Sequence, residues 1–147
     1  MSKLNSIVAS VPLFFNEDES VNYDDLQKYV ELVIKEGHAE LLYLMAYNSR
    51  INLLSFDEVV ELNHKLGEMC KGTDLKYTLC PPYKATNLEV RKFLENFDVN
   101  SALYGVSMLF PERIYDDFSV VMDYFNIPSD YGMKTLMHEM KYVSGKD

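Results

Sequence analysis

Four consecutive polar residues follow an apolar segment and carry hydrogen-bond donors and one cation. They are Tyr47, Asn48, Ser49 and Arg50. Asn and Ser side chains and backbone N–H groups donate hydrogen bonds to an oxyanion, and the guanidinium beside them suits an acidic substrate. The alternative interpretation is that these residues only solvate a loop.

Proton-transfer and amine groups occur near the end of the chain. His138 lies in a short apolar segment, and an imidazole relays protons near neutral pH. Lys141 follows three residues later, and a lysine amine condenses with carbonyl compounds. The plainer alternatives are that His138 is held by structural hydrogen bonds at a strand end and that Lys141 is a solvated charge.

Composition restricts the partners of these groups. The chain has 147 residues, the length of one domain, and its 14 Lys and Arg against 23 Asp and Glu give a net charge of −9. Such an acidic chain is a poor binder of nucleic acid or anionic membrane, and no apolar run approaches the length of a bilayer span. Cys70 and Cys80 form no zinc or disulfide pattern. We expect free thiols, no metal, no cofactor and a cytoplasmic location.

The elements that must position these residues repeat one unit, a short apolar run followed by an amphipathic helix. The predicted strands are 7–14, 41–46, 75–80, 102–109 and 135–140. The predicted helices are 23–36, closed by Gly37, two that begin at the capping boxes 55–58 and 86–89, and 116–125. Strict alternation indicates a parallel sheet with right-handed crossovers.

Two architectures use this unit. An open doubly wound sheet of five strands suits the length of the chain, whereas a (β/α)₈ barrel needs about 250 residues and fits only if the chain is part of one. Pattern and length alone favour the open sheet.

Four segments, in order along the chain, carry a more specific pattern. Residues 12–14 (Pro-Leu-Phe) precede an acidic turn, and residues 46–50 (Ala-Tyr-Asn-Ser-Arg) precede 54–58 (Leu-Ser-Phe-Asp-Glu). Residues 107–113 (Ser-Met-Leu-Phe-Pro-Glu-Arg) and 136–141 (Leu-Met-His-Glu-Met-Lys) complete the series. The series resembles the dihydrodipicolinate synthase/N-acetylneuraminate lyase family, the class I Schiff-base aldolases on a TIM barrel. The family has a Thr-Pro-Phe turn, a Gly-Thr-Thr-Gly-Glu signature with Leu-Ser-x-Glu-Glu, a Pro-Tyr-Tyr-type loop and a Tyr-Asn-Val-Pro motif in these places.

This resemblance reverses the preference for the open sheet. It implies a partial (β/α)₈ barrel of about five βα units, in a single domain of residues 1–147. It also implies an aldolase-type lyase or synthase that acts on pyruvate or a similar small 2-oxo acid. The open doubly wound sheet remains the alternative, with a regulator of flavodoxin type that binds a cation or a flavin as its function.

The resemblance assigns roles to the candidate residues. Tyr47, Asn48 and Ser49 replace the turn that holds the pyruvate carboxylate. His138 replaces the tyrosine that shuttles protons, and we expect it, rather than its neighbour Glu139, to face the barrel interior. Phe110 lies near the position at which the family has a tyrosine that lends its hydroxyl to the proton relay. Phenylalanine has no hydroxyl and cannot fill this role.

The Schiff-base lysine of the family lies on a sixth strand, beyond the end of this sequence. Lys141 is the candidate replacement, at the rim of the fifth strand. We expect the chain to be the first part of a longer aldolase-like product whose two open sheet edges promote association into a homo-oligomer. A non-catalytic remnant that only binds carboxylates is the alternative function.

Overall fold

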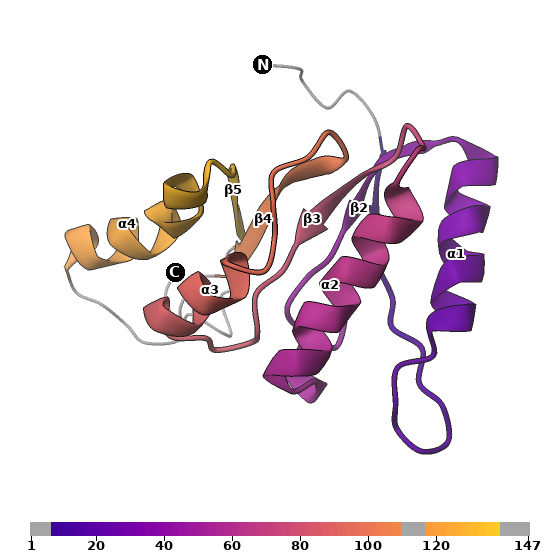
Figure 1. Cartoon of the computed structure of the whole chain (residues 1–147), viewed down its shortest axis with the longest axis horizontal. Coiled ribbons are helices and arrows are strands. Elements are labelled where there is room, and N and C mark those ends of the chain that lie inside the picture. The colour runs from indigo at the N-terminus through magenta and orange to yellow at the C-terminus, as the bar shows by residue number, and fades with distance from the viewer. Residues whose placement is uncertain (1–6, 110–116, 139–147) are drawn as a thin grey trace.

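The fold is a single parallel sheet whose five strands lie side by side in the order of the chain (Figure 1). The computed structural model describes residues 7–109 and 117–138. The strands are β1 (Ile7–Ser10), β2 (Ala39–Tyr43), β3 (Lys76–Leu79), β4 (Leu103–Leu109) and β5 (Thr135–His138). The helices are α1 (Tyr23–Glu36), α2 (Phe56–Cys70), α3 (Asn87–Leu94) and α4 (Phe118–Asn126), with 3₁₀ turns at Ile51–Leu53 and Ile127–Tyr131.

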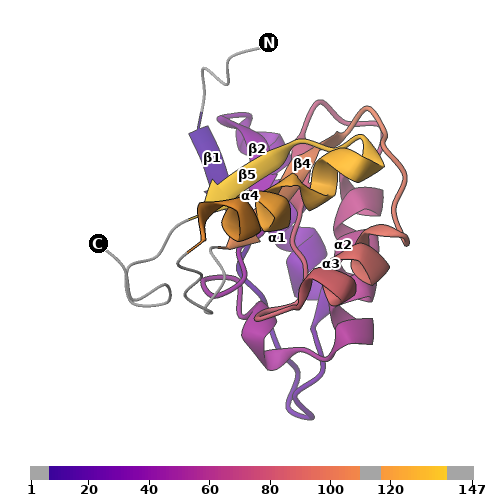
Figure 2. The ribbon, with the colours of Figure 1, turned by 90° about the vertical axis from the view of Figure 1, so that its left-hand side faces the viewer.

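The strand order decides between the two predicted architectures. A doubly wound sheet reverses its strand order at a switch point and carries helices on both faces. Here every neighbouring pair is parallel and consecutive, and right-handed crossovers then bring all helices to one face. Figure 2, seen from the β5 side, shows β1 on the left and α2 and α3 on the right. The chain is a curled half-barrel, so the partial-barrel prediction is confirmed and the open doubly wound sheet is wrong.

Local capping signals explain where the helices begin and end. The Asn22 side chain accepts a hydrogen bond from the Asp25 amide at the start of α1, and Gly37 ends the helix with φ 65°. The predicted capping boxes are present in full, with Ser55 paired with Glu58 before α2 and Thr86 with Glu89 before α3. Each box satisfies amides that the first helical turn leaves unpaired.

Several predicted boundaries differ from the observed ones. The second strand, expected over 41–46, runs from Ala39 to Tyr43. The first strand was expected over 7–14 but ends at Ser10, two residues before Pro12, which lacks the amide that a strand interior uses. The chain then turns back through an antiparallel bridge between Phe15 and Val21. The helix expected from residue 116 begins at Phe118, because the Asp117 carboxylate caps it by accepting from the Ser119 amide.

A continuous apolar core joins the sheet to its helices. Leu42, Leu79 and Val106 of the strands pack in the same cluster as Leu62 of α2 and Phe93 of α3, all fully buried. Burial of such side chains contributes roughly 1.5–3 kcal/mol each, so the helix layer holds the half-barrel together.

Cys70 and Cys80 also lie in this core and are free, as predicted. Within residues 7–109 and 117–138, no group of three His, Cys, Asp or Glu side chains could hold a metal ion. In the same part of the chain, no helix is both long and apolar enough to cross a bilayer.

Candidate functional site

Polar side chains line the face of the sheet that the helices leave open. Strand residues alternate between the two faces, so Tyr43 lies opposite the core residues Leu42 and Leu44, and Ser107 lies opposite Val106 and Met108. The strand register places Ser10 of β1, the partner of Tyr43, and His138 of β5, the partner of Leu109, on the same face. Leucines share this face, since Leu136 pairs with Ser107, and Ser107 itself is buried. The open face therefore carries hydroxyl and imidazole groups toward the carboxyl ends of the strands, where barrel enzymes place their active sites.

Tyr43 and His138 meet across this face. Their ring centroids are 6.3 Å apart at an interplanar angle of 74°, an edge-to-face contact that joins the ends of β2 and β5. The prediction that His138 faces the barrel interior agrees with this contact. Burial raises the pKa of the Tyr43 phenol above its ordinary value, while a hydrogen bond with Ser107 opposes the rise. At neutral pH Tyr43 is therefore a protonated hydroxyl that can donate a hydrogen bond.

The loop after β2 folds around Ser49. The Ser49 hydroxyl accepts a hydrogen bond of 3.0 Å from the Met45 amide, and the Ser49 amide donates to the Met45 carbonyl at 3.1 Å. Ser49 is fully buried by these contacts. Thr78 of β3 anchors the start of the loop by accepting from the Leu44 amide at 3.0 Å. Ser49 thus shapes the turn from inside, and its hydroxyl does not reach the surface.

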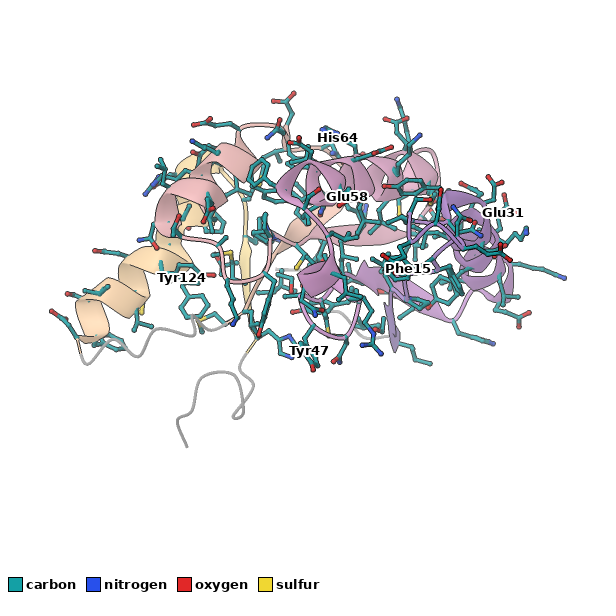
Figure 3. All side chains as sticks on the ribbon, turned by 90° about the horizontal axis from the view of Figure 1, so that it is seen from below. Phe15, Glu31, Tyr47, Glu58, His64 and Tyr124 are labelled. Carbon is teal, nitrogen blue, oxygen red and sulfur yellow. The ribbon has the colours of Figure 1, made fainter. Side chains whose placement is uncertain are left out.

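The other three candidates of this loop are exposed. Tyr47 is 46% exposed, and its ring lies 6.4 Å from that of Tyr83, which follows β3. Arg50 adopts a left-handed conformation, with φ 59°, and presents its side chain to solvent, as does Asn48. Viewed from the carboxyl ends of the strands, α2 lies above the sheet and Tyr47 below it, on the open side (Figure 3). The loop therefore places exposed donors and one cation beside the polar face.

One acceptor of the same region has no partner. Asn52 Oδ1 is buried and makes no hydrogen bond within the described residues, although the Asn52 amide donates to the Ala46 carbonyl at 3.2 Å. Buried polar atoms rarely lack a hydrogen-bond partner, so Asn52 Oδ1 can still accept a hydrogen bond.

Two candidates, Phe110 and Lys141, and the neighbour Glu139 lie outside the described residues. Conversely, Tyr43, Thr78 and Ser107 were not among the site residues predicted from the sequence. All three lie inside segments that were correctly predicted as strands. The available signal was a hydroxyl residue in an otherwise apolar strand, which in a buried parallel sheet requires a polar partner.

Known structures share this arrangement of strands and helices. The 4-hydroxy-tetrahydrodipicolinate synthase of Methylacidiphilum fumariolicum SolV superposes with a TM-score of 0.81 at 15% identity, covering 99% of this chain and 47% of its own. The N-acetylneuraminate lyase of Proteus mirabilis gives 0.81 at 14% identity, covering 97% and 48%. YagE of Escherichia coli K12, a protein of the dihydrodipicolinic acid synthase family in complex with pyruvate, gives 0.79 at 12% identity, covering 99% and 48%. No family sequence model and no curated protein sequence matches the chain.

These observations define the fold as part of a parallel βα barrel, of which this chain forms about half. The predicted resemblance to the dihydrodipicolinate synthase/N-acetylneuraminate lyase family is confirmed at the level of the fold. The chain spans about half the length of the solved structures that it matches.

Proposed function

We propose that the open face of the half-barrel binds a small 2-oxo acid such as pyruvate, and that the chain contributes this site to an aldolase-type lyase or synthase. The observation that carries the proposal is the contact between Tyr43 and His138 at the carboxyl ends of β2 and β5. It brings a neutral hydroxyl and an imidazole together on the open side of the sheet, where Tyr47 of the adjoining loop also lies (Figure 3), and Arg50 is an exposed residue of the same loop.

Each group has a role in this proposal. The Arg50 guanidinium and the side chains of Tyr47 and Asn48 bind the carboxylate, since they are exposed and donate hydrogen bonds. Ser49 holds the turn that presents them. His138 moves a proton at the carbon next to the substrate carbonyl, and the Tyr43 hydroxyl donates a hydrogen bond toward the developing negative charge.

Lys141 is the proposed amine. Its uncharged nitrogen attacks the carbonyl carbon of pyruvate, and water leaves as the imine forms. Loss of a methyl proton to His138 then gives an enamine, whose carbon can attack an aldehyde. Phe110 has no hydroxyl, so it cannot take part in the proposed proton relay.

Borohydride reduction in the presence of pyruvate tests the imine. We expect a carboxyethyl adduct on Lys141, found by peptide mass spectrometry and absent from Lys141→Arg. Lys134→Arg is the matched control because Lys134 precedes β5, at the opposite end of the strand, so this variant keeps the adduct. Failure to trap any lysine while pyruvate still binds would exclude the imine and leave the binding role. Failure to bind pyruvate would exclude both.

A non-catalytic carboxylate-binding module of the same fold is the second candidate. It is favoured by the buried Ser49 hydroxyl, whose contact with the Met45 amide makes it a structural group. The module would bind pyruvate through Arg50 and release it unchanged, whereas the enzyme would exchange the methyl protons of pyruvate with solvent deuterium. Proton NMR in deuterated buffer separates the two.

The setting we propose is cytoplasmic. Two free, buried cysteines support it, because secreted domains of this size commonly use their cysteines in disulfides.

A further inference from the structure

A cavity lies at the rim of the half-barrel opposite the proposed 2-oxo acid site, by the amino ends of β3, β4 and β5. Its volume is about 230 Å³. Lys76, the first residue of β3, and Lys134, just before β5, line it together with Ser101, Tyr104 and Gly105. At roughly 30 Å³ for each water molecule, the cavity has room for a small ligand with several waters.

The two ammonium groups are held in place by contacts that leave their charge unpaired. Lys76 Nζ donates to the Ser101 carbonyl at 2.7 Å, and Lys134 Nζ lies 5.3 Å from the centroid of the Tyr104 ring. Neither lysine forms an ion pair within the described residues. Since each ammonium carries three N–H donors and only one of the six is used in these contacts, both lysines keep donors for a ligand.

The charge of the lining contrasts with that of the whole chain. The chain carries a net charge of −9, yet the described residues that line the cavity include two lysines and no Asp or Glu. Two cations in one recess, without a carboxylate, raise the local potential and attract anions. An anion bound in this recess would be attracted by both lysines.

We propose that this cavity is a binding site for a small dianion, either a phosphate group or a compact dicarboxylate. Ser101 and Tyr104, whose side chains carry hydroxyl groups, are also among the lining residues. The site is separate from the proposed 2-oxo acid site, because it lies at the amino ends of the strands, whereas Tyr43 and His138 lie at the carboxyl ends.

Titration with inorganic phosphate and, separately, with malonate tests the proposal, with NMR amide shifts as the readout and the ionic strength held constant with NaCl. We expect saturable shifts at Ser101, Gly105 and Gly132 for at least one of the two anions. Saturation by phosphate alone identifies a phosphoryl ligand, and saturation by malonate alone identifies a dicarboxylate. Linear shifts with both anions, or no shifts, overturn the proposal.

Charge-removing variants show whether the two lysines form the site. Lys76→Met and Lys134→Met keep the aliphatic stem, and each should weaken binding about tenfold, the effect of losing one charged contact. Lys92→Met, at an exposed position on α3, should bind as the wild type does. Lys134 is exposed, and its Nζ makes no hydrogen bond to the backbone of residues 7–109 and 117–138, so its variant remains informative if Lys76→Met does not fold. Equal affinity of Lys134→Met and Lys92→Met contradicts the proposal.

Discussion

Asn63 of α2 and Cys80 at the end of β3 are joined by two reciprocal hydrogen bonds. The Cys80 amide donates to Asn63 Oδ1 at 2.9 Å, and Asn63 Nδ2 donates to the Cys80 carbonyl at 3.1 Å. Both residues are buried, with Asn63 fully so. A side chain of the helix layer thus replaces the ladder partners that β3 loses where it ends, and it fixes the rim of the half-barrel at this strand.

Removal of this amide should therefore destabilise the fold. Asn63→Leu leaves an amide and a carbonyl unpaired in the core, at a cost of about 2–4 kcal/mol in the free energy of unfolding. Urea denaturation followed by circular dichroism measures the loss. Asn87→Ala, at the exposed start of α3, is the control and should stay within about 0.5 kcal/mol of wild type. Equal stability of the two variants would mean that the paired hydrogen bonds contribute nothing.

A close backbone approach makes the stability of the fold sensitive to substitution of Gly105 in β4. A Cβ atom there would lie 2.7 Å from the Lys134 carbonyl oxygen and 2.7 Å from Leu136 Cδ1, so Gly105→Ala must push β5 away from β4. We expect a loss of about 1–3 kcal/mol in thermal or urea unfolding. Gly72→Asn is the matched control, because that position has open space around it and a φ of 76° that Asn tolerates. Unchanged stability of Gly105→Ala would contradict the packing of β5 on β4.

These results show which parts of the structure follow from local sequence. Both capping boxes and the Gly37 terminus were predicted because their chemistry lies within four residues. The barrel was inferred from resemblance, since length and pattern alone favoured an open sheet, and strand order depends on contacts between distant segments. The face to which Tyr43 points was not predictable, because a strand buried on both sides shows no alternation. The sequence shows that residue 49 is a serine, but it does not show where the Ser49 hydroxyl points. Its hydrogen bond with the Met45 amide determines that direction.

Buried ionisable groups predict a loss of stability at alkaline pH. Burial raises the pKa of the Cys70 thiol from 9.0 to about 12, and burial, with smaller contributions from Glu61 and Glu58, raises that of the Tyr23 phenol from 10.0 to about 12. Between pH 9 and 12 the folded state therefore holds protons that the unfolded chain has released. The stabilisation is complete below the unfolded pKa values and is lost as the pH rises toward the folded ones.

Urea denaturation at several pH values tests this linkage. Cys70 alone should contribute a fall of about 1 kcal/mol in the free energy of unfolding per pH unit within that range. Cys70→Ala removes the thiol, so its stability should decline less steeply although it starts lower because of the cavity. Parallel curves for the two proteins would show that the thiol does not contribute.

Exposed apolar side chains gather on the outermost elements of the half-barrel, which predicts self-association. Of the twelve large apolar residues exposed in the described segments, seven lie on β1, α1, α4 or β5, and none lies on the central helix α2. The seven are Ile7, Val8, Leu32, Ile34, Phe118, Met122 and Met137. Strands β1 and β5 each pair on one side only, and such edges join other chains. We expect homo-oligomers in solution.

A charge at either edge should reduce this association. Val8→Lys and Met137→Lys should shift the mass measured by light scattering toward that of the monomer, because each buries an ammonium if the edges pair. Leu88→Lys, at a position of α3 that is 63% exposed, should leave the mass unchanged. A monodisperse monomer of the wild type would overturn this prediction.

The most direct test of the proposed 2-oxo acid site is an NMR titration of the protein with pyruvate. We expect saturable shifts at Tyr43, Ser107 and His138. The affinity for pyruvate should fall about tenfold in Arg50→Gln, which loses its charged contact with the carboxylate, and should stay unchanged in Lys92→Gln. The absence of saturable shifts at these residues, or shifts confined to the cavity between Lys76 and Lys134, would contradict it.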